Sequence, residues 1–416
     1  MKGKMLLVVC LALAQTVFAT NGSNLTSVSP ASRGMGGIGV GMPVGAVDTT
    51  FKNPAWMPYY KDFHVSFDGI LFLPSVKART NLSPMGPMNP PAFEKSEVDR
   101  TVIPGLGIVD QYNDKLWLGM AAYGVSGFGV DYRNKDRRLA NMHTNFQFLR
   151  IMPSFAYKVN ESFSVGGSIH IGYGSLDMGA NLCRPATPPT CWNAGGGQSQ
   201  TFGAGFQVGF AFNSKDKVFA GFTYQSPISM TYKRVFDSDG NGSFEDFKLY
   251  QPQEVAFGFG VKPSENLKVG TDFRWINWKN AKGYEGFQWK DQLVIAVGSE
   301  YEPAEGVQVR AGWNYGKSPI RSGTKNPATS RNIPNFTAPF NDLQIAYFNL
   351  VGFPAITEHH ISLGVGYKIS ENFGLDISYE HVFNKKITAT DTLGIGFITE
   401  AQNAQNSLSI GLKWNF

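Results

Sequence analysis

Three arginines, Arg150, Arg274 and Arg310, lie in segments where every second residue is apolar. Successive residues of a strand point to opposite faces, so each arginine would face away from its large apolar neighbours. Arginine binds a carboxylate through two parallel N–H bonds, but a charge in a narrow interior also needs a partner. The same face carries the acidic residues Asp272, Glu300, Asp376 and Glu380. We expect most of these groups to form ion pairs and one of the three arginines to bind a ligand carboxylate.

Four histidines raise the question of catalysis, and they are His143, His170, His359 and His360. A hydrolase would need a nucleophilic serine beside a positioned base, and no motif in the chain supplies that pair. His170 falls on the same face as the arginines, which favours a hydrogen-bonded interior residue. We therefore expect no catalytic site and no enzymatic activity.

The segment Asp237–Glu245 (DSDGNGSFE) reads like the beginning of a calcium-binding loop, with Gly242 at the sharp turn. The twelfth position of the motif, however, is Lys248, where a bidentate glutamate is needed. Either Asp246 completes a weaker site, or the segment is a solvated acidic loop, and the second interpretation is favoured. No metal site and no cofactor are therefore predicted, and calcium binding by residues 237–248 stays an open alternative.

The first nineteen residues have the features of a secretory signal peptide. Lys2 and Lys4 precede an apolar run, Met5–Ala14, which is followed by the small-residue cleavage pattern Val17–Ala19. The apolar run is too short to span a bilayer. We expect residues 1–19 to direct export and to be removed.

Two cysteines remain after that removal, Cys183 and Cys191. An exported protein meets an oxidising compartment, which favours a disulfide-closed loop. A metal pair is the alternative, but no histidine or third cysteine nearby completes a ligand set. We predict that the two cysteines are joined.

The composition restricts the class of protein. The net charge of +5 is spread thinly, without the dense basic runs that nucleic-acid binding needs. No run of eighteen apolar residues follows residue 19, which excludes transmembrane helices. A soluble exported protein or a membrane β-barrel remains, because the bilayer admits no other spanning structure.

From about Asp62 onward, stretches of alternating apolar residues are separated by breaks. In Ile361–Ile369, for example, five apolar residues alternate with Ser362, two glycines and Lys368. Six short breaks and seven long ones alternate strictly, which predicts fourteen strands. The short breaks lie near 113–114, 160–161, 214–216, 264–266, 304–305 and 370–372, and the long ones near 75–99, 133–143, 179–199, 236–247, 283–288, 321–356 and 389–401.

Short turns, long loops and an even strand number are typical of outer-membrane barrels. We therefore expect residues 61–416 to form an all-β, transmembrane, 14-stranded antiparallel barrel. The last strand, Leu408–Phe416, must pair with the first, because closure removes the exposed edges. Residues 20–60 lack strand alternation and are rich in Gly, Ser and Pro. They form either a disordered leader or a plug inside the barrel.

The third strand of this barrel (AAYGVSGFGVDY) contains Gly124, Gly127 and Gly129. Glycine inside a strand weakens the ladder and permits a kink. Glycine is also ordinary on a crowded inner face, so a kinked and a regular strand are both compatible with the sequence.

Before the first strand the chain carries a glycine-rich segment, Arg33–Gly41, then Asp48, and then Asn53-Pro54-Ala55. This arrangement resembles the N-terminal hatch of the FadL-type family, the long-chain fatty acid and hydrocarbon transporters of Gram-negative outer membranes. Later segments resemble the same family in order and spacing, among them Met152–Lys158, Gly221–Ile228, Asp272–Trp278 and Val309–Tyr315. The resemblance extends over nearly all of the chain after the signal peptide.

The resemblance implies a barrel plugged by a hatch, residues 20–60, that takes up hydrophobic compounds such as fatty acids or aromatic hydrocarbons passively. The substrate would leave sideways into outer-membrane lipids through a gap beside a kinked third strand. Asn53, Pro54, Ala55, Gly124, Gly127 and Gly129 are the expected hatch and lateral-gate residues, and Arg150, Arg274 and Arg310 the candidate substrate ligands. The barrel-assembly machinery is an expected partner. A non-transporting adhesin or structural barrel is the alternative, and a water-filled porin is disfavoured because the plug would block it.

Overall fold

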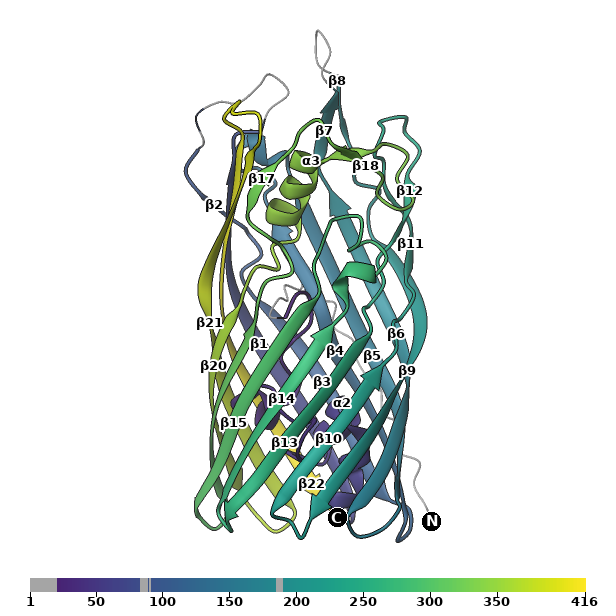
Figure 1. The fold of residues 1–416 in the computed structure, drawn as a ribbon, viewed down its shortest axis with the longest axis vertical. Helices are drawn as coiled ribbons and strands as arrows, with labels where there is room; N and C mark the ends of the chain where they lie inside the picture. Colours follow the sequence, from purple (N-terminus) through teal and green to yellow (C-terminus); the bar gives the residue numbers. More distant parts are fainter. Residues whose placement is uncertain (1–20, 83–88, 90, 185–189) are drawn as a thin grey trace.

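The computed structural model describes residues 21–82, 89, 91–184 and 190–416, and the predicted signal peptide lies outside these residues. Fourteen antiparallel strands form a closed barrel (Figure 1), so the predicted fold and strand number are confirmed. The wall strands are β1(Phe63–Thr80), β3(Thr101–Gln111), β4(Leu116–Asp131), β5(His143–Lys158), β6(Phe163–Gly179), β9(Ser199–Ser214), β10(Val218–Gln225), β13(Glu254–Ser264), β14(Leu267–Ile276), β15(Gln292–Ala304), β16(Val307–Gly316), β20(His359–Lys368), β21(Phe373–Asp391) and β22(Ile398–Asn415).

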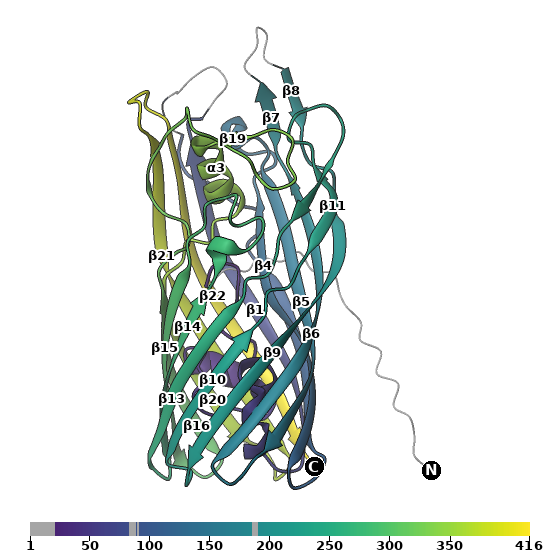
Figure 2. The ribbon, with the colours of Figure 1, turned by 45° about the vertical axis from the view of Figure 1, so that its right-hand side comes forward.

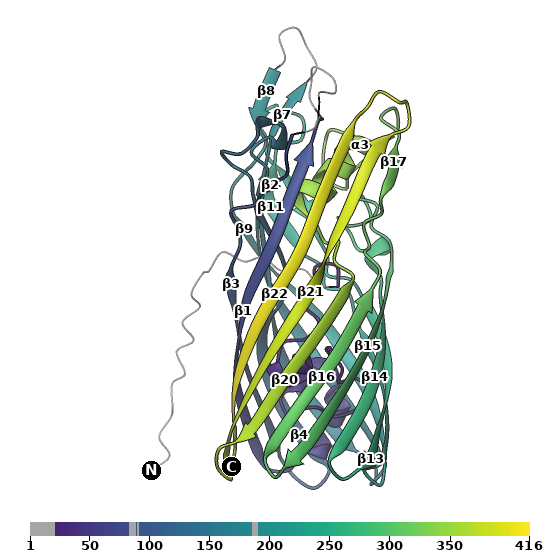
Figure 3. The ribbon, with the colours of Figure 1, turned by 90° about the vertical axis from the view of Figure 1, so that its left-hand side faces the viewer.

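The barrel closes where the last strand pairs with the first. β22 is antiparallel to β1 from His64↔Asn415 to Thr80↔Thr399, and Figure 3 shows this seam with β21 beside it. The other face of β22 pairs with β21. The edges of β1 and β22 that face each other are therefore paired along this whole ladder.

Each wall strand alternates between an outer apolar face and an inner face. On β13, Phe257 and Phe259 are 46% and 54% exposed on the outside, where lipid covers them in a membrane. Gly258 lies between them and faces the hatch. The alternation that predicts the strands in the sequence is thus the alternation between lipid and lumen.

The long connections carry short elements at one end of the barrel (Figure 2). Helix α3(Asp342–Tyr347) and a single π-helical turn, η4(Phe348–Gly352), lie in the mouth. The remaining short elements are β2(Glu94–Lys95), η2(Arg137–Leu139), β7(Asn181–Arg184), β8(Thr190–Asn193), β11(Thr231–Phe236), β12(Glu245–Lys248), η3(Trp278–Asn280), β17(Gly323–Lys325), β18(Ser330–Arg331) and β19(Phe340–Asn341). Among the described residues, no helix has the length and apolar character needed to cross a bilayer.

The hatch occupies the half of the barrel that carries the short turns (Figure 1). It contains α1(Pro30–Gly34), α2(Asp48–Lys52) and η1(Pro54–Tyr59). Ser29 caps α1 by accepting a bond from the Ser32 N–H, and Asn53 caps η1 in the same way through the Ala55 N–H. The segment is therefore a folded plug rather than a disordered leader.

A belt of wall glycines makes room for this plug. A Cβ atom on Gly258 would lie 2.7 Å from the Gly41 backbone nitrogen, and one on Gly166 would lie 2.6 Å from that of Ala55. Neither contact is compatible with a side chain unless backbone moves. We call seven of the inward-facing glycines that touch the hatch the glycine belt: Gly166, Gly209, Gly221, Gly258, Gly298, Gly312 and Gly364.

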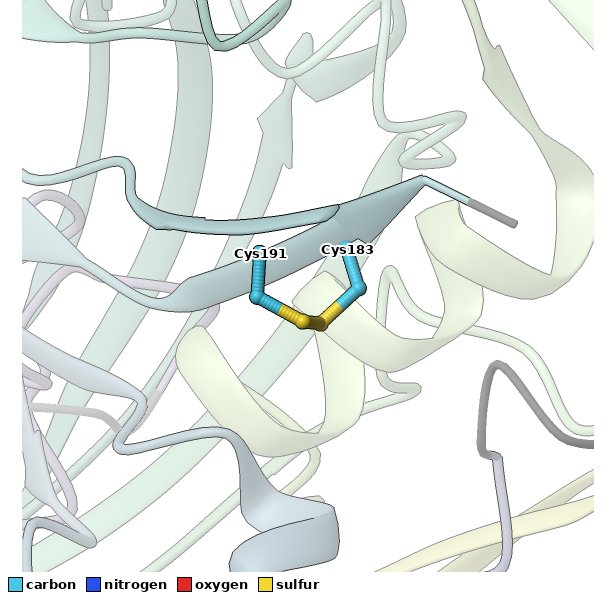
Figure 4. Close-up of a disulfide and its surroundings, with 2 residues drawn as sticks. All are labelled: Cys183 and Cys191. Atoms are coloured by element: carbon cyan, nitrogen blue, oxygen red, sulfur yellow. A yellow bond between two sulfur atoms is a disulfide. The ribbon is translucent and has the colours of Figure 1, made fainter. Parts of the chain in front are cut away.

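The predicted disulfide is present in a hairpin that projects from the mouth. Cys183 on β7 and Cys191 on β8 are directly opposite each other in the antiparallel pair and are bonded (Figure 4). The hairpin stands above the wall strands β6 and β9 that it connects (Figure 2).

The disulfide should stabilise the hairpin without being needed by the barrel. Replacing both cysteines (C183S/C191S) removes a cross-link that restricts the unfolded hairpin by about 2–3 kcal/mol. We expect cleavage in the hairpin by an added protease to become faster, while the thermal unfolding temperature of the barrel stays unchanged. In the native protein, both thiols should resist alkylation until a reductant is added. Rapid alkylation without reductant would contradict the pairing.

Candidate functional site

A series of buried aromatic rings leads from the mouth into the lumen. Phe340 stacks on Phe348 of η4, with the ring centroids 5.1 Å apart. Phe348 contacts Phe287 at 6.0 Å, and Phe287 contacts Phe353 at the same distance. Phe353 meets Phe128 of β4 edge to face at 5.4 Å. These rings come from two long loops and one wall strand.

The series continues downward to the N-terminal end of the hatch. Phe128 lies 5.8 Å from Trp289, which lies 5.2 Å from Trp278. Trp278 contacts Tyr284 at 4.7 Å, and the Tyr284 hydroxyl is 3.3 Å from the Ser23 hydroxyl. We call this series the aromatic column, made of Phe340, Phe348, Phe287, Phe353, Phe128, Trp289, Trp278 and Tyr284.

The wall is interrupted beside the lower end of the aromatic column. The ladder between β3 and β4 ends at Gly105↔Tyr123, although β4 continues to Asp131. β4 also has a bulge against β5 between Gly124 and Ser126. Beyond it, both faces of β4 are buried from Val125 to Val130.

Two sets of contacts close this interruption. Near the mouth, the Glu97 N–H donates to the Asp131 carbonyl and the Ser96 N–H to the Val76 carbonyl, at 3.0 and 2.9 Å. Lower down, the hatch replaces β3. The Leu25 N–H donates to the Val125 carbonyl and the Gly127 N–H to the Ser23 carbonyl, both at 3.0 Å.

We call the part of the wall between these contacts the β4 window. The edge of β4 is here covered from inside by a hatch segment, Ser23–Leu25, rather than by a wall strand. The Ser126 hydroxyl also donates to the Ser23 hydroxyl at 2.8 Å.

The predicted gate residues are only partly brought together at the β4 window. Gly124 flanks the bulge, the Gly127 N–H bonds to the hatch, and Gly129 continues in the β5 ladder opposite Asn145. None of the three has a positive φ. The bulge is therefore formed without the positive φ angles that favour glycine.

Asn53 lies elsewhere, and this corrects one expectation. The family resemblance implies a place for Asn53 in a lateral gate beside the third strand. Its amide instead donates to the carbonyls of Val40 and Phe210, at 3.1 and 3.0 Å. Pro54 and Ala55 follow it against the glycine belt, at Gly209 and Gly166. The freed groups of β4 are satisfied by Ser23 and Leu25, because these residues run alongside the strand.

The three arginines have different environments. Arg310 is held between Glu300 and Asp376 at 2.7 Å each, and Lys268 and Lys413 extend this network. Arg274 pairs with Glu254 at 2.7 Å, and Glu254 also accepts a bond from Asn24 of the hatch at 2.8 Å. Both arginines are thus engaged by carboxylates.

Arg150 lacks such a partner. It is 3% exposed and donates to the Gln225 side-chain oxygen at 2.5 Å, and its guanidinium lies 5.8 Å from the Phe148 ring centroid. Its Nε is buried without a hydrogen-bond partner, and among the described residues no carboxylate lies within 4.0 Å of it. A cavity of about 40 Å³ adjoins Arg150, Leu25 and Val125. A buried cation therefore lies next to the β4 window.

Two ionic anchors hold the hatch, and only the wall side of each is evident in the sequence. The Asp272 carboxylate accepts three backbone bonds, from the N–H groups of Gly39, Val40 and Gly41 at 2.7–2.8 Å. Arg33 of the hatch pairs with Glu380 at 2.9 Å, with both side chains fully buried. These charges fix the plug to strands on different sides of the wall.

The acidic loop after β11 uses its carboxylates for backbone bonds. Asp237 accepts from the N–H groups of Gly240 and Gly242 at 2.7 and 2.9 Å, and Glu245 accepts from Ser238. Among the described residues no group of three or more His, Cys, Asp or Glu side chains is arranged to hold a metal ion.

His170 bonds to the Ser168 hydroxyl at 3.0 Å in the lumen.

Comparison with known proteins agrees with this geometry. Residues 10–335 match the family model described as "Outer membrane protein transport protein (OMPP1/FadL/TodX)". The chain belongs to this family. It is accordingly an outer-membrane transport protein and not an enzyme. No curated protein sequence matches the chain.

Several solved structures share the fold at low sequence identity. The toluene transporter TodX of P. putida aligns with a TM-score of 0.68 and 15% identity, over 94% of this chain and 99% of that one. The toluene transporter TbuX of Ralstonia pickettii gives 0.65 and 16%, with the same coverage. A monoaromatic hydrocarbon channel, CymD, gives 0.64 and 18%, over 95% and 99%.

The Asp272 anchor predicts how the hatch can be loosened. In D272N an NH2 group replaces one of the two carboxylate oxygens and faces hatch N–H groups, whose bonds it cannot accept. We therefore expect the hatch to be destabilised by roughly 3–5 kcal/mol. Amide hydrogen exchange at Gly39–Gly41 should accelerate while exchange in the wall strands does not. The same replacement at Asp391, which accepts backbone bonds from Ile395, Gly396 and Phe397 in the connection between β21 and β22, should leave hatch exchange unchanged. Equal protection of these amides in D272N and the native protein would contradict the anchoring role.

Proposed function

We propose that the chain takes up small hydrophobic molecules passively and releases them sideways through the β4 window into the membrane. The observation that carries this proposal is the course of the aromatic column, which begins in the mouth and ends where the wall ladder is interrupted. The structurally similar proteins TodX and TbuX are toluene transporters and CymD is a monoaromatic hydrocarbon channel, which supports the same substrate class.

The aromatic column offers an apolar surface to a hydrophobic molecule. Such a molecule therefore loses little transfer free energy when it leaves the lipopolysaccharide layer and enters the barrel. Its rings are buried and in edge or offset contact, so a flat or extended ligand can replace one ring contact with another. η4 fills the upper end through Phe348. Entry therefore requires η4 and the loop that carries it to move aside.

Sideways release fits the physical chemistry of such a substrate. Keeping an alkyl or aryl surface out of water is worth roughly 25 cal/mol per Å². The route towards the short turns is polar by comparison. A cavity of about 340 Å³ lies there between hatch and wall, and Asp48, Asp68 and Lys413 are among its lining residues. An apolar molecule gains more by passing from Tyr284 through the β4 window into lipid.

Arg150 extends the proposal to substrates that carry a carboxylate, such as fatty acids. It is the one of the three candidate arginines whose guanidinium has no carboxylate partner among the described residues. A substrate carboxylate beside Phe148 would supply the missing charge, with the alkyl chain in the aromatic column. Arg274 and Arg310 act in this proposal as structural partners of Glu254, Glu300 and Asp376.

A reversible disulfide across the β4 window tests the exit route. Asn24 and Ser126 are bridge partners across the β4 window, and this spacing suits a disulfide. We expect the oxidised N24C/S126C variant to lose nearly all uptake of toluene or of a fatty acid, and a reductant to restore it. The measurement is accumulation of labelled substrate in cells, with barrel assembly checked at the same time.

The matched control joins two wall strands that are already paired. T271C/V297C places a cross-link between β14 and β15, at positions that are register partners, and should leave uptake unchanged in both redox states. Unchanged uptake in oxidised N24C/S126C would refute the lateral exit and favour the polar cavity as the route. Absence of uptake by the native protein would instead favour a structural or adhesive barrel.

The role of Arg150 is tested by comparing two substrates on one variant. In R150Q a fatty acid loses a charge-assisted contact worth roughly 1.5–3 kcal/mol, so its apparent affinity should fall about tenfold or more. Uptake of toluene, which has no carboxylate, should change little and serves as the internal control. A parallel loss for both substrates would assign Arg150 to packing of the lumen instead.

A further inference from the structure

Four adjacent strands near the mouth present a row of outward-facing polar side chains, three of them lysines. In the strand register, Lys95 of β2 lies opposite Lys77 of β1, and Lys77 lies opposite Gln402 of β22. Gln402 in turn lies opposite Lys386 of β21. Lys95, Lys77 and Lys386 are all exposed. Figure 3 shows β1, β22 and β21 side by side on this face.

The pair Lys77 and Lys95 is unfavourable for the isolated protein. Like charges directly opposite each other in an antiparallel pair are destabilising. Lys95 reaches Asp99 at 3.3 Å, but among the described residues no carboxylate lies within ion-pair distance of Lys77. An arrangement that costs stability in the free protein is explained if an anion outside the barrel bridges the two lysines.

Neighbouring residues hold Lys386 of this row and one further cation, Arg79, in place. Glu400 accepts from Arg79 and from Lys386, so that one carboxylate serves two cations. Both cations also contact the Phe93 ring, whose centroid is 4.6 Å from the Arg79 guanidinium and 5.7 Å from the Lys386 ammonium. These contacts fix the positions of Arg79 and Lys386 while leaving the cations partly exposed, at 27% and 44%.

The row lies directly above the lipid-facing surface of the same strands. On β1 the outward residues before Lys77 are Leu71, Leu73 and Ser75, and Leu71 faces Leu408 and Val102 on the neighbouring strands. The apolar side chains at 71, 73, 102 and 408 are exposed and would contact acyl chains. The lysines follow at the mouth end, at the level where lipid headgroups begin.

We propose that Lys77, Lys95 and Lys386, with Arg79, form a docking site for a phosphorylated lipid of the outer leaflet, namely the phosphates of lipid A. The leaflet on the mouth side of an outer-membrane barrel consists of this lipid. Its phosphates match the cations and its acyl chains match Leu71 and Leu73. The site lies on the outer wall and is independent of the transport proposed for the lumen.

The experiment measures the thermal unfolding of the whole purified barrel in neutral detergent, with bisphosphorylated lipid A added in increasing amounts. Binding to the folded state should raise the unfolding temperature. In K77Q/K95Q/K386Q the concentration needed for this rise should increase about tenfold or more, since each cation near a lipid phosphate contributes roughly fivefold in affinity. Without lipid, K77Q alone should unfold no earlier than the native protein, because it removes the repulsion with Lys95 and breaks no ion pair among the described residues.

Two controls make the result specific. K279Q/K290Q removes charge from the same end of the barrel, away from the four strands, and should respond to lipid A like the native protein. Dephosphorylated lipid A and inorganic phosphate alone should each fail to raise the unfolding temperature. If the triple variant does not assemble, K77Q alone should still weaken the response about fivefold. Equal responses of native protein and variants to lipid A, or an equal effect of inorganic phosphate, would overturn the proposal.

Discussion

In the bilayer, every backbone N–H and C=O group must find a partner within the protein, and the architecture of this chain follows from that requirement. It explains why β22 returns along the whole length of β1. It also explains the β4 window, where the β3 ladder ends at Gly105 and hatch residues supply the missing bonds. The hatch is in this respect a part of the wall as well as a plug.

A folded segment fits inside a barrel of this width only if the inner face of the wall carries no side chains where the segment passes. The glycine belt removes them where the hatch backbone passes, at Gly166 and Gly258 among others. Charges then replace the packing that is lost. Asp272 binds three hatch N–H groups, and Glu380 binds Arg33. The lumen is consequently held by close backbone contacts and a few strong polar anchors below, and by aromatic packing above.

The wall could be predicted from the sequence because the two-residue period and the short turns are local signals. The aromatic column could not, since Phe287, Phe348 and Phe353 come from irregular loops whose contacts have no period. The sequence also did not distinguish Arg150 from Arg310, because the presence of a carboxylate partner depends on strand register. Glu300 lies opposite Arg310, whereas the residues opposite Arg150 are Tyr123 and Gly172. Asn53 was placed wrongly for the same reason, since its partners Val40 and Phe210 are distant in sequence.

The closure of the β4 window has an energetic consequence. It consists mainly of two backbone bonds and the contacts of the Ser23 hydroxyl with Ser126 and Tyr284. Each such bond contributes a net ~0.5–1.5 kcal/mol, so the sum is comparable to the few kcal/mol that separate a ground state from its populated minor conformers. Thermal fluctuation is therefore sufficient to break the contacts between the hatch and β4 that close the window. On the proposed lateral route, passage therefore needs neither a nucleotide nor an ion gradient, and its rate is set by how often these contacts break.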